Sequence, residues 1–297
     1  MEYPNQCFRC ISNHCFKTFI FINFSFNVKT HARKNMEDLF IVKIGGDTLN
    51  HPQKLQKCIQ DCAESGQKII LVHGGGKKVT DLAGKLGIQQ QMVEGRRITS
   101  PETMDLCTMI YAGLISKNIV ATFFQNGTKA IGLSGADLAC IQSEKRQHPS
   151  IDYGMVGDVK HVDVSFFADF VDKKVVPVVC SVTMDQDGQL LNTNADTIAS
   201  EIAKAMCDQY KVHLIYCFEK NGVLTDIEDE HSVLKTITNQ EFIQMKETKQ
   251  IADGMIPKLQ SAYKVLFHGV EEVRIINSGS LHSYFVKEKP GTQIILH

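Results

Sequence analysis

Two glycine pairs could form backbone sites for an anion. Gly45-Gly46 follows the apolar run 39–44, and Gly74-Gly75, with Gly76 next to it, follows the apolar run 68–72 and His73. Glycine lets the backbone approach a ligand closely, and the N-terminus of a following helix adds its positive dipole end. A tight strand-to-helix turn has the same sequence pattern. Each pair alone is therefore compatible with either a phosphate site or a simple turn.

Two familiar phosphate motifs can be excluded. The chain has no G-x-x-x-x-G-K-S/T, and no G-x-G-x-x-G follows its first expected strand. These motifs mark the P-loop and the dinucleotide fingerprint, respectively. A phosphate site in this chain must be of another kind.

Three charged residues could complete such a site. Lys43 interrupts an otherwise apolar strand, and a buried ammonium group needs an anionic partner. Lys258 falls in the first turn of a helix opened by the segment 253–257, and Asp196 ends the polar run 192–196. A lone lysine is usually a solvated surface residue, and the polar run is also typical of a loop with a helix N-cap. No single one of these residues identifies the site.

The elements that must position these residues alternate between strand and helix, which predicts an α/β fold with a mainly parallel sheet. Continuous apolar runs predict strands at 39–44, 68–72, 129–133, 175–180, 212–217, 272–276 and 292–296. Helical spacing and capping signals predict helices around Leu55 to Ala63 and at 77–86, 100–127, 163–173, 195–207, 238–248 and 255–268.

Composition narrows the class of protein. The 297 residues include 32 Lys+Arg and 33 Asp+Glu, a formal charge of -1, so we expect no nucleic-acid partner. No run of about 18 uninterrupted apolar residues occurs, so we expect no membrane partner. Cysteines scattered from Cys58 to Cys217 are typical of reduced thiols and predict a cytoplasmic protein. Cys7, Cys10, His14 and Cys15 form one ligand cluster without a second, so we expect no metal site.

Residues 1–35 differ in character from the rest of the chain. Their aromatic segment 16–28 is interrupted by polar residues and lacks the features of a signal peptide. We expect Met36 to be the natural start, with an interaction arm as the alternative. Beyond it we expect two fused lobes, 36–185 and 186–297.

Five ordered motifs carry a resemblance to a known family. They are VKIGG (42–46), VHGGG (72–76), GRRIT (95–99), NTNAD (192–196) and DGMIPK (253–258). Together they resemble the signature set of the acetylglutamate kinases, which belong to the amino-acid kinase superfamily. The resemblance implies a three-layer αβα sandwich and transfer of the γ-phosphoryl group of MgATP to the side-chain carboxylate of an N-acylglutamate, the second step of arginine biosynthesis.

The resemblance also implies roles for individual residues. Lys43 and Lys258 would flank the transferred phosphoryl group, and Asp196 would hold both lysines in place. Arg97, Asn192 and Asn194 would bind the amino-acid end of the substrate, together with Gly75. Backbone N–H groups of the two glycine loops would bind phosphate: Gly45, Gly46, Gly74 and Gly75. The segment 88–98 would form a hairpin lid. The lobe 36–185 would bind the amino-acid substrate and form the dimer, and the lobe 186–297 would bind ATP.

The region expected to contact the nucleotide departs from the family pattern. The family commonly has an aspartate after the strand that corresponds to 212–217, whereas Glu219 follows it here. The resemblance implies nucleotide contacts at Glu219, Gly222 and Gly254. Because no extra N-terminal helix fits after Met36, we expect a homodimer that arginine does not inhibit.

Other functions remain open from the sequence. A glutamate 5-kinase or an aspartokinase-like enzyme would share the glycine loops, although GRRIT and NTNAD favour an N-acylglutamate site. An inactive nucleotide-binding regulator would share the fold. The presence of both lysines and of Asp196 counts against it, because a regulator could lose them. The sequence does not distinguish acetyl from succinyl or another acyl group.

Overall fold

An eight-stranded sheet forms the centre of the computed structural model, which describes residues 36–297 except 94, 227, 249 and 252–254. The strand order is β12-β14-β13-β11-β1-β2-β8-β5, and every neighbouring pair is parallel except β13 with β14. The strands are β1 (Asp38–Ile44), β2 (Lys68–His73), β5 (Ala130–Leu133), β8 (Val176–Cys180), β11 (Lys211–Phe218), β12 (Thr236–Thr238), β13 (Glu272–Asn277) and β14 (Thr292–Ile295).

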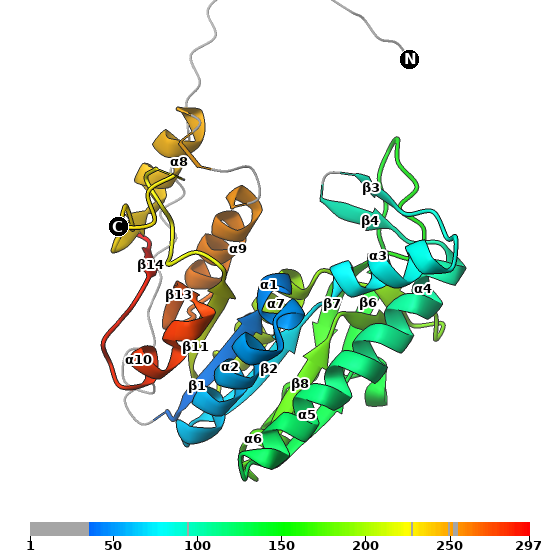
Figure 1. Cartoon of the computed structure of the whole chain (residues 1–297), viewed down its shortest axis with the longest axis horizontal. Coiled ribbons are helices and arrows are strands. Elements are labelled where there is room, and N and C mark those ends of the chain that lie inside the picture. Colours follow the sequence, from blue (N-terminus) through cyan, green and yellow to red (C-terminus); the bar gives the residue numbers. More distant parts are fainter. Residues whose placement is uncertain (1–35, 94, 227, 249, 252–254) are drawn as a thin grey trace, which may run out of the picture. The chain divides into compact units, whose positions relative to one another are not determined.

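Helices cover both faces of this sheet (Figure 1). One face packs against α6 (Val164–Val171), α7 (Ala195–Met206), α8 (Asn239–Glu247) and α9 (Ile256–Phe267). The other face packs against α1 (Gly46–Asn50), α2 (Pro52–Glu64), α3 (Gly76–Lys85), α4 (Pro101–Thr108), α5 (Ser116–Gln125) and α10 (Leu281–Phe285). Central strands buried on both faces require continuous apolar runs, and β1 and β2 have them. The predicted αβα fold class is confirmed.

A second sheet was not predicted. Its order is β10-β9-β6-β7, with β6 (Ile141–Lys145), β7 (Gly157–Val162), β9 (Val182–Met184) and β10 (Leu190–Asn192). These strands are short or polar on one face, so no continuous apolar run marks them. A separate hairpin of β3 (Gln91–Val93) and β4 (Arg96–Ile98) confirms the hairpin expected at 88–98.

Helix-capping signals in the sequence are realised in the structure. The Ser100 side chain accepts a hydrogen bond from the N–H of Thr103, with Pro101 next to the cap. Thr238 and Glu241 form a reciprocal capping box at the start of α8. Short 3-10 turns occur at Asp137–Ala139 and Ser278–Ser280.

The predicted long helix contains an irregular segment. Residues Met109–Ile115, between α4 and α5, form a π-helix. By length and composition, the continuous stretch Pro101–Gln125 could cross a membrane, but 44% of its most apolar window is buried inside the fold. Ile119 and Phe123 are fully buried against the sheet, as in a core helix.

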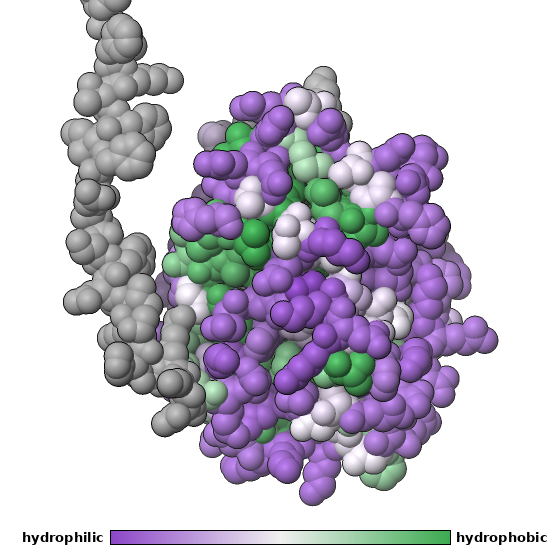
Figure 2. Space-filling view, turned by 90° about the vertical axis from the view of Figure 1, so that its left-hand side faces the viewer, coloured by the Kyte–Doolittle hydropathy of each residue, from purple (hydrophilic) through white to green (hydrophobic). Residues whose placement is uncertain are grey.

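The two expected lobes share one sheet. Strand β1 from the segment 36–185 pairs with β11 from the segment 186–297. Residues 36–297 form one compact unit, and the expectations for residues 1–35 lie outside the described residues. The functional division at residue 185 remains a prediction. Figure 2 shows that the side carrying α8 and β14 is largely hydrophilic, with apolar groups gathered in a few places.

Candidate active site

Two ammonium groups from distant parts of the chain meet on one carboxylate. Lys43 Nζ lies 2.6 Å from Asp196 Oδ1, and Lys258 Nζ donates a hydrogen bond to Asp196 Oδ2. The three side chains come from β1, α9 and the first turn of α7, and each is less than one-fifth exposed. The predicted juxtaposition of these residues is confirmed, although their catalytic roles remain a prediction.

The electrostatics of this triad follow from burial and pairing. Burial alone would raise the pKa of the Asp196 carboxyl, but Lys43 and Lys258 outweigh it and lower that pKa to about 2. Burial lowers the pKa of Lys258, as does the charge of Lys43, while Asp196 opposes both effects. Asp196 is therefore ionised at neutral pH, and it helps to keep Lys258 protonated.

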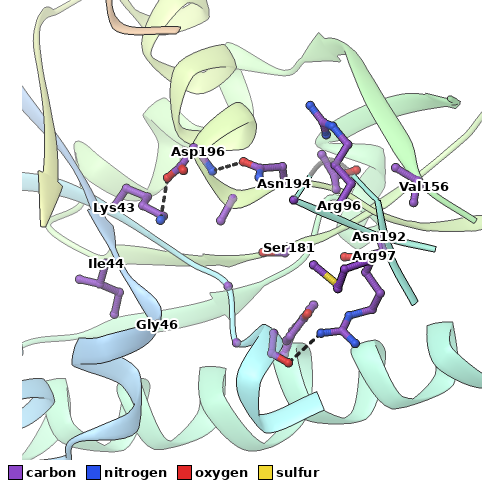
Figure 3. A pocket seen from close by; sticks show the side chains of 18 residues that line it. Lys43, Ile44, Gly46, Arg96, Arg97, Val156, Ser181, Asn192, Asn194 and Asp196 are labelled. Carbon is purple, nitrogen blue, oxygen red and sulfur yellow. Dashed lines mark hydrogen bonds and ion pairs between the residues drawn. The ribbon is translucent and has the colours of Figure 1, made fainter. Parts of the chain in front are cut away.

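A cavity of about 230 Å³ opens beside the triad (Figure 3). Lys43 and Asp196 lie at one end in the close-up, and the two arginines of β4 lie at the other. Among its lining residues that the structure describes, Asp196 is the only carboxylate, so positive charge dominates the cavity. Such a site suits an anionic ligand with charge at both ends.

The glycine loops line the middle of this cavity. A Cβ atom at Gly46 would meet no heavy atom within 4 Å, so its backbone faces open space. Gly75 has φ +154°, and a Cβ there would lie 2.3 Å from Ile115 Cδ1, so only glycine fits without a shift. Gly75 caps α3 without any side-chain hydrogen bond, which leaves the first N–H groups of this helix available to an anion. Gly74 also lines the cavity.

Gly45 is placed differently from the sequence expectation. Its N–H donates to the carbonyl oxygen of Cys217 at 3.2 Å, and it is not among the cavity-lining residues. Because parallel pairing of β1 with β11 continues into the loop, this N–H completes the sheet ladder. This N–H is therefore already paired in the structure, and the phosphate contact at Gly45 remains a prediction.

Arg97 lies in the cavity wall with its guanidinium group held by neighbours. Its Nη2 donates to the carbonyl oxygen of Gly76 and to Thr80 Oγ1, each at 2.9 Å, and its Nη1 donates to Gln90. The side chain thus ties the hairpin to the N-terminal half of α3. Its planar fork remains suited to a carboxylate at the cavity's end.

The two predicted asparagines have structural partners. Asn192 Nδ2 donates to Thr99 Oγ1 at 3.1 Å, and Asn194 Oδ1 accepts the N–H groups of Asp196 and Thr197 as the N-cap of α7. Both residues line the cavity. Capping by Asn194 fixes the turn that presents Asp196, so at least part of its role is positional.

The cavity-lining residues that sequence reasoning did not name include Arg96, Tyr111 and Ser181. Arg96 stands inside the GRRIT motif, so a signal was present, and Figure 3 shows it pointing away from Arg97. Tyr111 belongs to the π-helix, which no sequence pattern marked. Ser181 donates to the carbonyl oxygen of His73 at 3.0 Å, a contact between residues far apart in the chain.

The predicted nucleotide residues lie outside this cavity. Glu219 is exposed, and its carbonyl oxygen accepts a hydrogen bond from Asn277. Gly222 has φ +154° and packs against Thr292, and it also lines a small apolar cavity of about 70 Å³ with Phe218 and Leu224. Gly254 lies outside the described residues. None of these observations tests nucleotide binding.

The fold, the paired lysines and the glycine-lined cavity are accompanied by a clear family match. The profile of the amino acid kinase family matches residues 38–277, so the chain belongs to the amino acid kinase family. Its relatives within that family include acetylglutamate kinases. That of Bacteroides thetaiotaomicron is 45% identical over 258 residues, which cover 87% of this chain and 98% of the relative. That of Cytophaga hutchinsonii is 45% identical over 262 residues, which cover 88% of this chain and 99% of the relative.

Solved structures show the same fold. A Streptococcus mutans protein, smu.665, superposes with a TM-score of 0.73 at 27% identity, covering 87% of this chain and 99% of its own. An N-acetylglutamate synthase from Neisseria gonorrhoeae gives a TM-score of 0.74 at 19% identity, covering 87% of this chain and 59% of its own, and supports the fold alone. These comparisons confirm the family and the enzyme class predicted from the five motifs.

Proposed function

We propose that the protein transfers the γ-phosphoryl group of ATP to the side-chain carboxylate of N-acetyl-L-glutamate or a related N-acylglutamate. The observation that carries this proposal is the pair of lysines held on Asp196 beside a glycine-lined cavity with Arg97 at its far end. The relatives named acetylglutamate kinase support the choice of substrate.

The chemistry requires positive charge more than it requires a base. A glutamate carboxylate has an ordinary pKa of about 4.3, so it is already ionised at neutral pH. The barrier comes from bringing this anion onto a negatively charged phosphate chain. Lys43 and Lys258 would flank the transferred group and offset its charge, and the N–H groups of the Gly46 and Gly75 loops would orient its oxygens.

A divalent cation would enter with the nucleotide. Mg²⁺ supplies charge neutralisation at the phosphates when bound. The only carboxylate among the described cavity-lining residues, Asp196, is already paired with two lysines. The phosphates of ATP, and not this carboxylate, would therefore hold Mg²⁺.

The test is an assay of ADP release with N-acetylglutamate, glutamate or aspartate as acceptor. Of these three acceptors, we expect turnover only with N-acetylglutamate. Turnover with free glutamate or aspartate instead would identify another amino-acid kinase, and no turnover with any acceptor would favour a nucleotide-binding regulator. A series of N-acylated glutamates, including succinyl, would then define the acyl pocket.

We further propose the pathway, the location and the oligomeric state of the protein. The activity would serve the second step of arginine biosynthesis in the cytoplasm, with small molecules as partners and without nucleic acid or membrane. Exposed Met109, Leu114 and Phe124 on the long helix support a homodimer, because large apolar side chains on one helix favour burial in an interface. Light scattering should give twice the chain mass, and arginine should not inhibit turnover.

A further inference from the structure

A second cluster of chemically active side chains lies outside the cavity. Asp61 and Glu64 on α2 and His282 on α10 place one potential ligand atom each within 4.8 Å of one another. Asp61 and Glu64 are three residues apart, so they share one face of α2, and α10 packs beside this helix. Two oxygen ligands and one imidazole nitrogen therefore converge from two elements.

Asp61 is the buried member of this cluster, and its burial favours a bound cation. Its side chain is fully buried, and Oδ1 forms an ion pair with Lys57 at 2.5 Å. Oδ2 is buried and has no hydrogen-bond partner among the described residues. A buried carboxylate oxygen without a partner is costly, and a cation beside it would remove that cost.

The cluster lies at the end of the sheet opposite the catalytic cavity. Glu64 ends α2 just before β2 begins at Lys68, whereas the glycine loops follow the other ends of β1 and β2. On α10, Tyr284 donates to Glu272, the first residue of β13. Figure 1 shows α10 and the end of α2 far from the β3–β4 hairpin.

We propose that Asp61, Glu64 and His282 bind one divalent transition-metal ion of the Zn²⁺ type, which fastens α10 to α2. Carboxylate and imidazole ligands in one set favour such ions over Mg²⁺ or Ca²⁺, which prefer oxygen alone. Ligand atoms around such an ion lie about 2.0–2.2 Å from it, so Glu64 and His282 close on the ion. Both are exposed, which lets them move and gives the ion a path of entry.

Lys57 provides a specific test of metal binding at Asp61. Its ammonium competes with the ion for the Asp61 carboxylate. Replacement by a neutral residue, Lys57→Gln, should therefore tighten metal binding about tenfold or more. A purely structural Lys57–Asp61 pair would make the same variant less stable and would leave metal affinity unchanged.

Co²⁺ is a suitable probe for the full-length chain in the absence of nucleotide. We expect one Co²⁺ to bind with a visible spectrum that lacks thiolate charge-transfer bands, and to raise the unfolding temperature. At 100 times the dissociation constant, the ion should favour the folded state about 100-fold. His282→Gln and Asp61→Asn should abolish both effects. His231→Gln, which changes another exposed histidine, should preserve them.

Two results would overturn the proposal. Affinity unchanged by His282→Gln would exclude this site, as would thiolate bands that assign the ion to cysteines. Because His282 is exposed, its variant should fold even if the buried Asp61→Asn variant does not.

Discussion

Replacing Asp196 by asparagine isolates the role of the central carboxylate. The change removes the negative charge that Lys43 and Lys258 share while keeping the size of the side chain. At 2.6 Å and an effective dielectric constant of about 20, the Lys43 pair alone is worth about 6 kcal/mol before desolvation is subtracted. Breaking a buried ion pair costs about 3–5 kcal/mol. Because this pair is partly exposed, we expect the free energy of unfolding to fall by about 3 kcal/mol. Urea denaturation should show a loss of this size.

The same change should make activity depend on pH. Burial already lowers the pKa of Lys258, and Asp196 is the group that opposes this shift. Without the carboxylate, the pKa of Lys258 should fall further, because burial and the charge of Lys43 then act unopposed. The kcat of Asp196→Asn should then decline as pH rises, because the ammonium form is lost.

The matched control is Asp47→Asn, which removes a similar ion pair with Lys54 at 2.8 Å on the surface. Exposed pairs contribute about 0–1 kcal/mol, so this variant should keep its stability and its pH–kcat profile. If Asp196→Asn were as stable as wild type and gave the same kcat profile, the electrostatic account of the site would be refuted.

Three further predictions use steady-state kinetics and pH titration. Lys258→Ala should lower kcat by at least about 100-fold with circular dichroism unchanged, because a charge aimed at the transferred group is lost. Arg97→Ala should mainly raise the KM for the N-acylglutamate, and an unchanged KM would contradict its placement at the substrate carboxylate. Burial lowers the pKa of His73 to about 4, so the unfolded chain binds a proton between about pH 6.5 and 4 that the folded chain does not. Stability should therefore fall by about 3 kcal/mol as pH drops through this window, and His73→Asn should remove most of that dependence in urea titrations.

The sequence predicted the main sheet except its edge strand β12, because of where the other strands lie. Strands such as β1 and β8 are buried on both faces, so each appears as a continuous apolar run. Strands β6 and β7 have polar residues on one face and pair through a register shift, which no local pattern reveals. The π-helix at Met109–Ile115 was also missed, because its residues continue the helical pattern of the flanking segments; two of them, Tyr111 and Ile115, lie against Gly75.

The site was predictable only in part. Lys43 was conspicuous because charge inside a buried strand is rare. Its meeting with Lys258 was predicted through the family resemblance, because 215 residues separate them along the chain and no spacing rule connects them. Gly45 was assigned a phosphate contact because a glycine pair does not reveal which N–H completes the sheet ladder. Asp61 gave no signal, because burial of a helix carboxylate depends on the elements that pack against its helix, and these include α5 and α10, which are far away in the sequence.

The arrangement of Asp196 explains how Lys43 and Lys258 can be held close to each other beside the cavity. Two ammonium groups side by side repel each other, and burial adds a desolvation cost for both. A carboxylate between them leaves a net charge of about +1, enough to attract a phosphoryl group while keeping both lysines protonated. Asp196 lies in the first turn of α7, where the helix dipole favours a negative charge, and Asn194 fixes that turn by capping it. The substrate's phosphate chain would then compete with Asp196 for the lysines, so both ammonium groups can transfer to it without being exposed to bulk water.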